Sequence, residues 1–119
     1  MKKQYLIDHL RCVPDFPQKG INFRDITSWF IDPKCISIMT DLLVEQYKDH
    51  GITKIVGLES RGFLMGSILS KELHAGFVLA RKPGKLPVKT VKESYAKEYG
   101  TDTLEIAYDA ITPDDVVLI

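Results

Sequence analysis

Two short apolar runs, separated by a stretch whose apolar residues have helical spacing, constrain the fold of this chain more than any other feature. Residues 53–58 and 77–80 have the length and composition of buried strands. Between them, apolar residues recur at helical spacing, at Leu64, Met65, Ile68, Leu69 and Leu73, with an end near Gly76. A strand, a helix and a strand in so short a stretch form a βαβ unit, whose two strands are parallel. The sequence therefore predicts an α/β fold with a central parallel sheet flanked by helices.

The segments after this unit predict a ribbon and one further strand. Residues 88–91 and 103–110 are expected to pair as an antiparallel ribbon, because apolar residues alternate with polar or small ones in the second segment. We expect the ribbon to join the parallel strands in one mixed sheet. After a turn over residues 112–115, the run VVLI at 116–119 is expected to be a fully buried parallel strand.

The first thirty residues are predicted to form a small helical and extended region. Residues 3–12 are expected to be a helix with Leu6 and Leu10 on one face. Two prolines and Gly20 then exclude regular structure, and residues 22–30 are expected to be extended.

A longer helix is predicted to follow. Asp32 is a suitable N-cap, and Pro33 suits the first helical position. Apolar residues then recur at helical spacing, at Ile36, Met39, Leu42, Leu43 and Tyr47. Gly51 is well placed to end this helix.

Composition indicates a single globular domain over residues 1–119. Sixteen basic and sixteen acidic residues cancel, so no overall field attracts nucleic acid or a membrane surface. The apolar runs are too short to cross a bilayer. Cys12 and Cys35 lack the spacing of a metal site, which predicts two free thiols and no metal bound by the protein alone. Because the first twelve residues lack a signal-peptide pattern, we expect a cytoplasmic location.

The turn after residues 53–58 has an unusual composition. Glu59, Ser60, Arg61 and Gly62 stand between the end of a strand and the start of a helix, where free backbone N–H groups and the helix dipole favour an anion. Ser60 is expected to cap the helix, Arg61 to offer a charged fork suited to phosphate oxygens, and Gly62 to let a ligand approach the backbone. The alternative is a solvated turn with a Glu59–Arg61 ion pair.

A second basic segment follows the second strand. The loop RKPGK, residues 81–85, should emerge at the same edge of the sheet as the first turn. Arg61 would then face Arg81 and Lys85, and three converging cations suit a polyanion such as pyrophosphate. The alternative is a mobile surface loop.

Four segments together give the chain a resemblance to a known family. They are DFPQKGINFRDIT (15–27), GLESRGF (57–63), RKPGKLP (81–87) and SYAKEYG (94–100). In this order and spacing the chain resembles the purine phosphoribosyltransferases, and most closely those that use adenine. The resemblance covers nearly all 119 residues and implies a type I phosphoribosyltransferase fold. It also implies conversion of adenine and 5-phosphoribosyl-1-pyrophosphate into AMP and pyrophosphate, with Mg²⁺ bound along with the substrate.

The resemblance also assigns the first thirty residues a role at the base. Residues 1–30 would form a helix and a small hood, in which Asn22, Phe23 and Arg24 lie over the purine. Phe23 would stack or pack on the ring, whereas its plain alternative is a core aromatic. The family usually has an aliphatic residue where this chain has Asn22, so the details of base recognition stay open.

The remaining roles fall on the turn, the loop and a flap. Glu59, Ser60 and Arg61 would form the pyrophosphate loop, and Arg81 and Lys85 would bind the same pyrophosphate, across a dimer interface in a homodimer. Residues 81–103 would form the basic loop and a flexible flap.

Three residues stand out on that flap. It would carry Tyr95, Tyr99 and the catalytic acid/base Glu98, which would handle a purine-ring proton. From the residues alone, a solvated hairpin acid is the favoured interpretation of Glu98, and only the family resemblance reverses that preference.

The motif that most identifies the family is not among these residues. It is an acidic pair followed by a phosphate loop after the strand that matches residues 116–119. Asp114 and Asp115 precede that strand, so they lie at its wrong end to substitute. We therefore expect the chain to be a fragment of a longer enzyme, inactive by itself, and a naturally short inactive protein is the alternative.

Three rival functions stay open from the sequence. One is a xanthine- or hypoxanthine-using relative. Another is a ligand-sensing regulator, which would need a basic face or a helix-turn-helix to bind nucleic acid. The third is an assembly fragment that binds neither adenine nor pyrophosphate.

Overall fold

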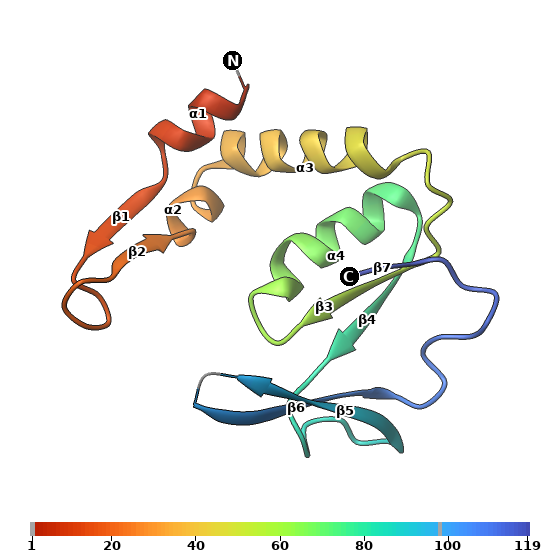
Figure 1. Ribbon diagram of the computed structural model, residues 1–119. Coiled ribbons are helices and arrows are strands. Elements are labelled where there is room, and N and C mark those ends of the chain that lie inside the picture. Colours follow the sequence, from red (N-terminus) through yellow and green to blue (C-terminus); the bar gives the residue numbers. More distant parts are fainter. Residues whose placement is uncertain (1, 98) are drawn as a thin grey trace. The chain divides into compact units, whose positions relative to one another are not determined.

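The computed structural model describes residues 2–97 and 99–119 (Figure 1). The chain divides into two compact units, residues 1–45 and residues 46–119. Helix α3 (Pro33–Tyr47) runs from the first unit into the second.

The first unit begins with a helix and a two-stranded ribbon. Helix α1 spans Lys2–Asp8, and strands β1 (Arg11–Pro14) and β2 (Asn22–Asp25) pair antiparallel, with Val13 opposite Phe23. The prediction of a helix over residues 3–12 is thus wrong beyond Asp8. The physical reason is the ribbon, because pairing with β2 holds residues 11–14 extended in place of another helical turn.

The segment expected to be extended at residues 22–30 is extended only in its first half. Helix α2 occupies Thr27–Phe30. The carboxylate of Asp25 accepts hydrogen bonds from the backbone N–H and the hydroxyl of Thr27, at 3.0 and 2.6 Å. An aspartate that captures a donor two residues ahead favours a turn over a strand, which explains the correction.

The start of α3 confirms the capping prediction. Asp32 Oδ1 accepts the backbone N–H of Lys34 at 2.9 Å, and its second oxygen accepts the hydroxyl of Tyr5 at 2.8 Å. Helix α3 buries Cys35, Ile38 and Met39 and ends at Tyr47, a few residues before Gly51, which has a positive φ of 66°.

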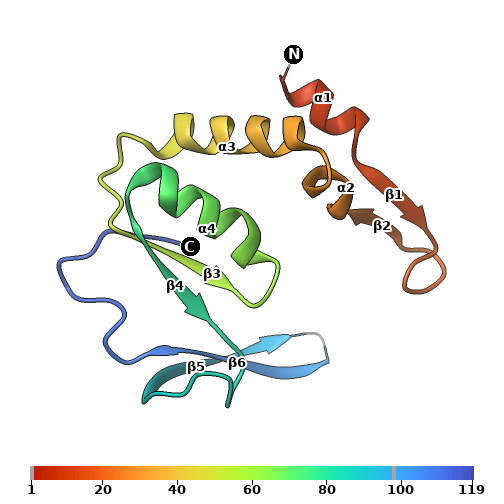
Figure 2. The same ribbon diagram turned by 180° about the vertical axis from the view of Figure 1, so that it is seen from behind.

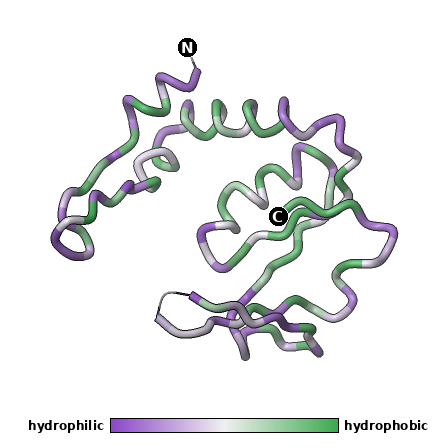
Figure 3. Tube along the Cα trace, viewed as in Figure 1, coloured by the Kyte–Doolittle hydropathy of each residue, from purple (hydrophilic) through white to green (hydrophobic). Residues whose placement is uncertain are grey.

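The second unit contains the predicted βαβ arrangement. Strands β3 (Lys54–Leu58) and β4 (Gly76–Ala80) are parallel, and helix α4 (Gly62–Leu73) connects them. In Figure 1 the arrowheads of β3 and β4 point the same way, towards the hairpin below them, and Figure 2 shows the same arrangement from behind. Hydrophobic colour follows β3 and β4 in Figure 3, and the turn after β3 is hydrophilic.

Glycines bring α4 unusually close to the sheet. A Cβ atom placed on Gly66 of α4 would lie 2.6 Å from Cε1 of Phe77 on β4, and one on Gly57 of β3 would lie 2.5 Å from Cζ of the same ring. Real Cβ contacts are not this short, so the Phe77 ring occupies the space left by two absent side chains.

The opposite face of the sheet carries an apolar cluster. Val56, Val78 and Ala80 are buried there, and the partly buried residues packed on them are Leu104, Ile106, Ala110 and Ile111. Strands β5 (Thr90–Lys97) and β6 (Gly100–Ala107) form the predicted antiparallel hairpin, in which β5 is longer than expected and β6 ends at Ala107, so the strand prediction is wrong for residues 108–110. They make a sheet of their own rather than one mixed sheet, joined to the end of β4 by a bridge between Arg81 and Glu105.

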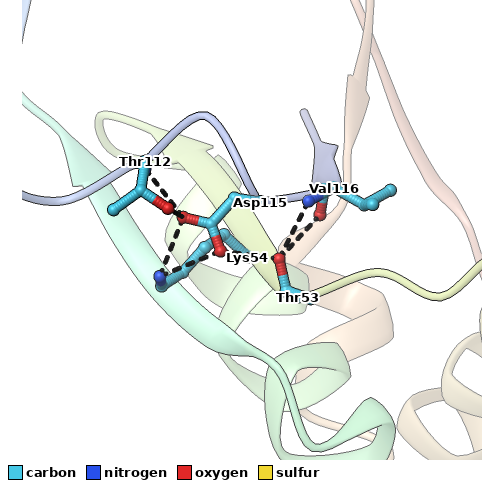
Figure 4. Close-up of polar contacts among 5 residues, drawn as sticks. All are labelled: Thr53, Lys54, Thr112, Asp115 and Val116. Atoms are coloured by element: carbon cyan, nitrogen blue, oxygen red, sulfur yellow. Dashed lines mark hydrogen bonds and ion pairs between the residues drawn. The ribbon is translucent and has the colours of Figure 1, made fainter.

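The last strand, β7 (Val117–Leu118), pairs parallel with β3 at the other edge of the sheet. It is not fully buried as predicted, because an edge strand has one neighbour, and 37% of Val117 is exposed. The predicted turn before it is confirmed, with a 3.0 Å hydrogen bond from the N–H of Asp115 to the carbonyl of Thr112. Figure 4 shows that the Asp115 carboxylate also contacts Lys54 and Thr53 at the start of β3.

Candidate functional site

The turn after β3 and the loop after β4 lie together at the carboxyl edge of the sheet. The two strands are parallel and in register, with Leu58 opposite Ala80. The N–H of Glu59 donates a 2.8 Å hydrogen bond to the carbonyl of Ala80, so the turn is tied to the end of β4. The peptide bond that follows, between Glu59 and Ser60, is cis. The prediction that the two segments share one edge is confirmed.

The Glu59 carboxylate binds the basic loop through three contacts. Oε1 accepts from Arg81 Nε at 3.3 Å and from the backbone N–H of Lys82 at 2.9 Å, and Oε2 accepts from Lys85 Nζ at 2.8 Å. These contacts, with the Lys85 hydrogen bond the largest cause, lower the pKa of Glu59 to about 2. Glu59 is therefore ionised at neutral pH, and its ion pairs are with Arg81 and Lys85 rather than with Arg61.

A second acid holds the basic loop from the hairpin side. The backbone of Glu105 on β6 exchanges two hydrogen bonds with that of Arg81, at 2.8 and 2.7 Å. Its carboxylate accepts the N–H of Gly84 at 2.9 Å and the hydroxyl of Thr90. The Thr90 hydroxyl is the largest cause of the lowered pKa of Glu105. The loop is thus anchored on two sides, in contrast to the mobile-loop alternative.

Sequence reasoning missed the role of Glu105. The alternation along residues 103–110 predicts a half-exposed strand, and an acid at an alternate position of such a strand suggests contact with solvent. The basic loop could have indicated an acid such as Glu105, because its backbone N–H groups and its cations need acceptors nearby.

Ser60 does not have its expected role, and Gly62 has a packing contact of its own. Helix α4 begins at Gly62 without a side-chain cap, and Ser60 contributes its carbonyl, which accepts the N–H of Phe63 at 3.0 Å. The prediction of a Ser60 side-chain cap is therefore wrong. The close approach at Gly62 is to protein backbone, since a Cβ there would lie 3.3 Å from Cα of Gly57.

Arg61 is the exposed cation of this turn. Its side chain forms no ion pair or hydrogen bond with any residue that the structure describes. The structure thus brings Glu59, Arg81 and Lys85 together by direct contact, whereas Arg61 stands beside them with its donors available to a ligand.

The three residues expected at the base lie on β2 in the first unit. Phe23 is half-buried and packs edge-on against Phe16, with ring centroids 5.2 Å apart. Asn22 and Arg24 are exposed on either side of it. One aromatic ring with polar neighbours on a short ribbon suits the hood assigned by resemblance, and its role at the base stays a prediction.

The flap residues lie on and beside the β5–β6 hairpin. Tyr95 is exposed on β5, with its hydroxyl 3.4 Å from the carboxylate of Asp102. Tyr99 is 88% exposed. Glu98 lies outside the described residues, so its assignment as acid/base stays a prediction.

Among the described residues there is neither a group of metal ligands nor a membrane-spanning helix. No group of three or more His, Cys, Asp or Glu residues there is arranged to hold a metal ion. Glu59, one of the two acids bound to the basic loop, already accepts from three donors. The donor set therefore does not form a Mg²⁺ site by itself. No helix within 2–97 or 99–119 has the length and apolar character needed to cross a membrane.

Similarity to known proteins extends over the whole chain. No protein-family model matches the chain. The adenine phosphoribosyltransferase of Phocaeicola vulgatus is 58% identical over all 119 residues. The chain belongs to the adenine phosphoribosyltransferase family. It spans 68% of the length of that relative.

Solved structures of adenine phosphoribosyltransferases share the fold. The enzyme from Rhodothermus marinus superposes with a TM-score of 0.88 at 48% identity, over 98% of this chain and 66% of that one. The protein from Trypanosoma brucei, solved with AMP, pyrophosphate and ribose-5-phosphate, gives 0.83 at 28% identity, over 98% of this chain and 52% of that one. The type I phosphoribosyltransferase fold is confirmed. The chain covers about two thirds of the length of the Phocaeicola vulgatus and Rhodothermus marinus proteins.

Proposed function

We propose that the full-length protein transfers the phosphoribosyl group of 5-phosphoribosyl-1-pyrophosphate to adenine, which releases pyrophosphate and gives AMP in purine salvage. The 58% identity to a named adenine phosphoribosyltransferase over the whole chain carries this proposal. AMP and pyrophosphate, the two products, are among the ligands in the structure of the Trypanosoma brucei relative. The relatives are named for adenine, which favours it over the xanthine or hypoxanthine alternative.

The carboxyl edge of the sheet supplies the groups that pyrophosphate release needs. Breaking the bond at the anomeric carbon leaves positive charge on the ribose and places negative charge on the departing pyrophosphate. Arg61 is exposed beside the helix start, and Arg81 and Lys85 are held next to the same turn. We propose that these three cations, with the backbone of residues 59–61, bind the pyrophosphate group. Mg²⁺ bound to the substrate's own phosphate oxygens would neutralise further charge.

The hood and the flap complete the proposed site. Asn22, Phe23 and Arg24 are assigned to the purine, with Phe23 against the ring face. Tyr95 and Tyr99 belong to the hairpin that would exclude water from the reactive sugar. Glu98 would move the purine-ring proton as general acid/base. We also propose a homodimer and a cytoplasmic location, the latter supported by the two free thiols, Cys12 and Cys35.

The experiment that tests this function measures nucleotide formation by the full-length protein. Adenine, hypoxanthine and xanthine are each supplied with 5-phosphoribosyl-1-pyrophosphate and Mg²⁺, and the products are separated by chromatography. We expect AMP from adenine and little nucleotide from the other two bases. The 119 residues alone, assayed in parallel, are expected to give no AMP. Preference for hypoxanthine or xanthine would overturn the assignment of adenine, and no product from any base would overturn the activity.

A further inference from the structure

Glu59 lies deeper than the cations that it binds. Its side chain is 10% exposed, compared with 31% for Arg81 and 49% for Lys85. A ligand that arrives from solvent therefore meets the two cations first. The less exposed carboxylate already accepts from three donors, Arg81, Lys82 and Lys85, and so has about one of its four accepting positions left.

The charge of Glu59 also argues against contact with pyrophosphate. An ionised carboxylate only accepts hydrogen bonds and repels the negatively charged phosphate oxygens. We propose that Glu59 is a positioning residue, whose carboxylate holds Arg81 and Lys85 ready for the pyrophosphate group and does not itself touch that group. This inference rests on the proposed function and corrects the direct pyrophosphate contact that resemblance gives Glu59.

The atoms used in the Arg81 contact support a positioning role. Glu59 is bound by Nε, the inner nitrogen of the guanidinium. The two terminal nitrogens of Arg81 have no hydrogen-bond partner among residues 2–97 and 99–119. The contact thus fixes the direction of the side chain and leaves its outer donors for an anion.

The backbone of the loop has anchors that do not involve Glu59. Glu105 exchanges backbone hydrogen bonds with Arg81 and accepts the N–H of Gly84. A change at Glu59 should therefore release the Arg81 and Lys85 side chains while the loop backbone keeps its path.

The test compares three variants of the full-length protein. Glu59→Gln removes the charge, and Glu59→Asp keeps the charge but withdraws it by one methylene from Lys85 Nζ. Glu72→Gln is the control for net charge, because Glu72 lies near the end of α4 and pairs only with its neighbour Lys71 among the described residues. Binding of inorganic pyrophosphate is measured by titration calorimetry, and the KM values for 5-phosphoribosyl-1-pyrophosphate and adenine are measured separately.

We expect both Glu59 variants to bind inorganic pyrophosphate about tenfold more weakly, the loss of one charge-assisted contact. The KM for 5-phosphoribosyl-1-pyrophosphate should rise while that for adenine stays constant, and Glu72→Gln should match the wild type. Equal or tighter pyrophosphate binding by Glu59→Gln would overturn the positioning role alone, as would an equal rise in both KM values. If the wild type does not bind pyrophosphate, the proposed function fails and this inference with it.

Discussion

The hydroxyl of Thr53 donates a hydrogen bond of 2.7 Å to the carboxylate of Asp115, a residue 62 positions later in the chain. The same carboxylate accepts from Lys54 Nζ at 3.1 Å and from the N–H of Thr112 at 2.8 Å (Figure 4). These contacts attach the turn before β7 to Lys54, the first residue of β3, and to Thr53 just before it. They set the register of the two strands, in which Lys54 lies opposite Val117.

Replacement of Asp115 by asparagine should therefore lower thermal stability. The hydrogen bonds from Thr112, Thr53 and Lys54 hold the pKa of Asp115 below its usual 3.8. A carboxylate with a lowered pKa stabilises the fold above its unfolded pKa, and the contribution is lost as the pH falls through the folded pKa. We expect the unfolding midpoint of Asp115→Asn to fall by a few degrees at pH 7 and the difference from wild type to shrink below about pH 4.

Asp114→Asn is the matched control for that measurement. Asp114 is the preceding residue, is exposed, and forms no side-chain hydrogen bond with the described residues. It should change the midpoint little at either pH. An equal fall for both variants would show that turn composition, and not the Asp115 contacts, determines the effect.

Gly66 offers a test of the packing between α4 and the sheet. Alanine in place of glycine inside a helix normally stabilises a protein by about 0.5–1 kcal/mol. Here the new Cβ would lie 2.6 Å from the Phe77 ring, so we expect Gly66→Ala to lower the free energy of unfolding by about 1–3 kcal/mol. Chemical denaturation measures it. Adding Phe77→Leu should recover part of the loss, and Ser67→Ala, on the exposed side of α4, should change stability by less than about 0.5 kcal/mol.

The parts of the fold that the sequence predicted are those set by local chemistry. The βαβ unit follows from apolar spacing between residues 53 and 80, and the start of α3 follows from Asp32 and Pro33. The errors lie where a distant partner decides. Residues 11–14 are extended because β2 pairs with them, and the hairpin forms a separate sheet because Arg81 and Glu105 meet only at a bridge.

The candidate site was also predictable only in the part that local sequence determines. That two basic segments meet at one sheet edge follows from parallel strands, and the structure confirms it. Glu59 pairs with Arg81 and Lys85 and not with Arg61, although Arg61 is nearer in sequence. This pairing depends on how the loop after β4 folds back towards the turn after β3. No local sequence pattern predicts the course of that loop.

Arg61 is expected to contribute directly to pyrophosphate binding. Its side chain is exposed and has no partner among the described residues, so truncation should remove ligand contacts without disturbing the fold. We expect Arg61→Ala to raise the KM for 5-phosphoribosyl-1-pyrophosphate about 10- to 100-fold, with the KM for adenine unchanged. Lys71→Ala removes an equal charge near the far end of α4 and serves as control. An unchanged KM for the phosphorylated substrate would exclude Arg61 from the site.

Glu98 is expected to act on the proton and not on substrate binding. In Glu98→Gln the side chain keeps its size but loses the ability to exchange a proton, so kcat should fall about 10²- to 10⁴-fold. Binding of inorganic pyrophosphate should stay at the wild-type value, which separates this effect from that of Arg61→Ala. Glu93→Gln is the matched control, because Glu93 is an exposed acid on β5 of the same hairpin, opposite Leu104. If both variants lower kcat equally, the charge of the hairpin as a whole matters and Glu98 is not the acid/base; if neither does, proton transfer depends on another group.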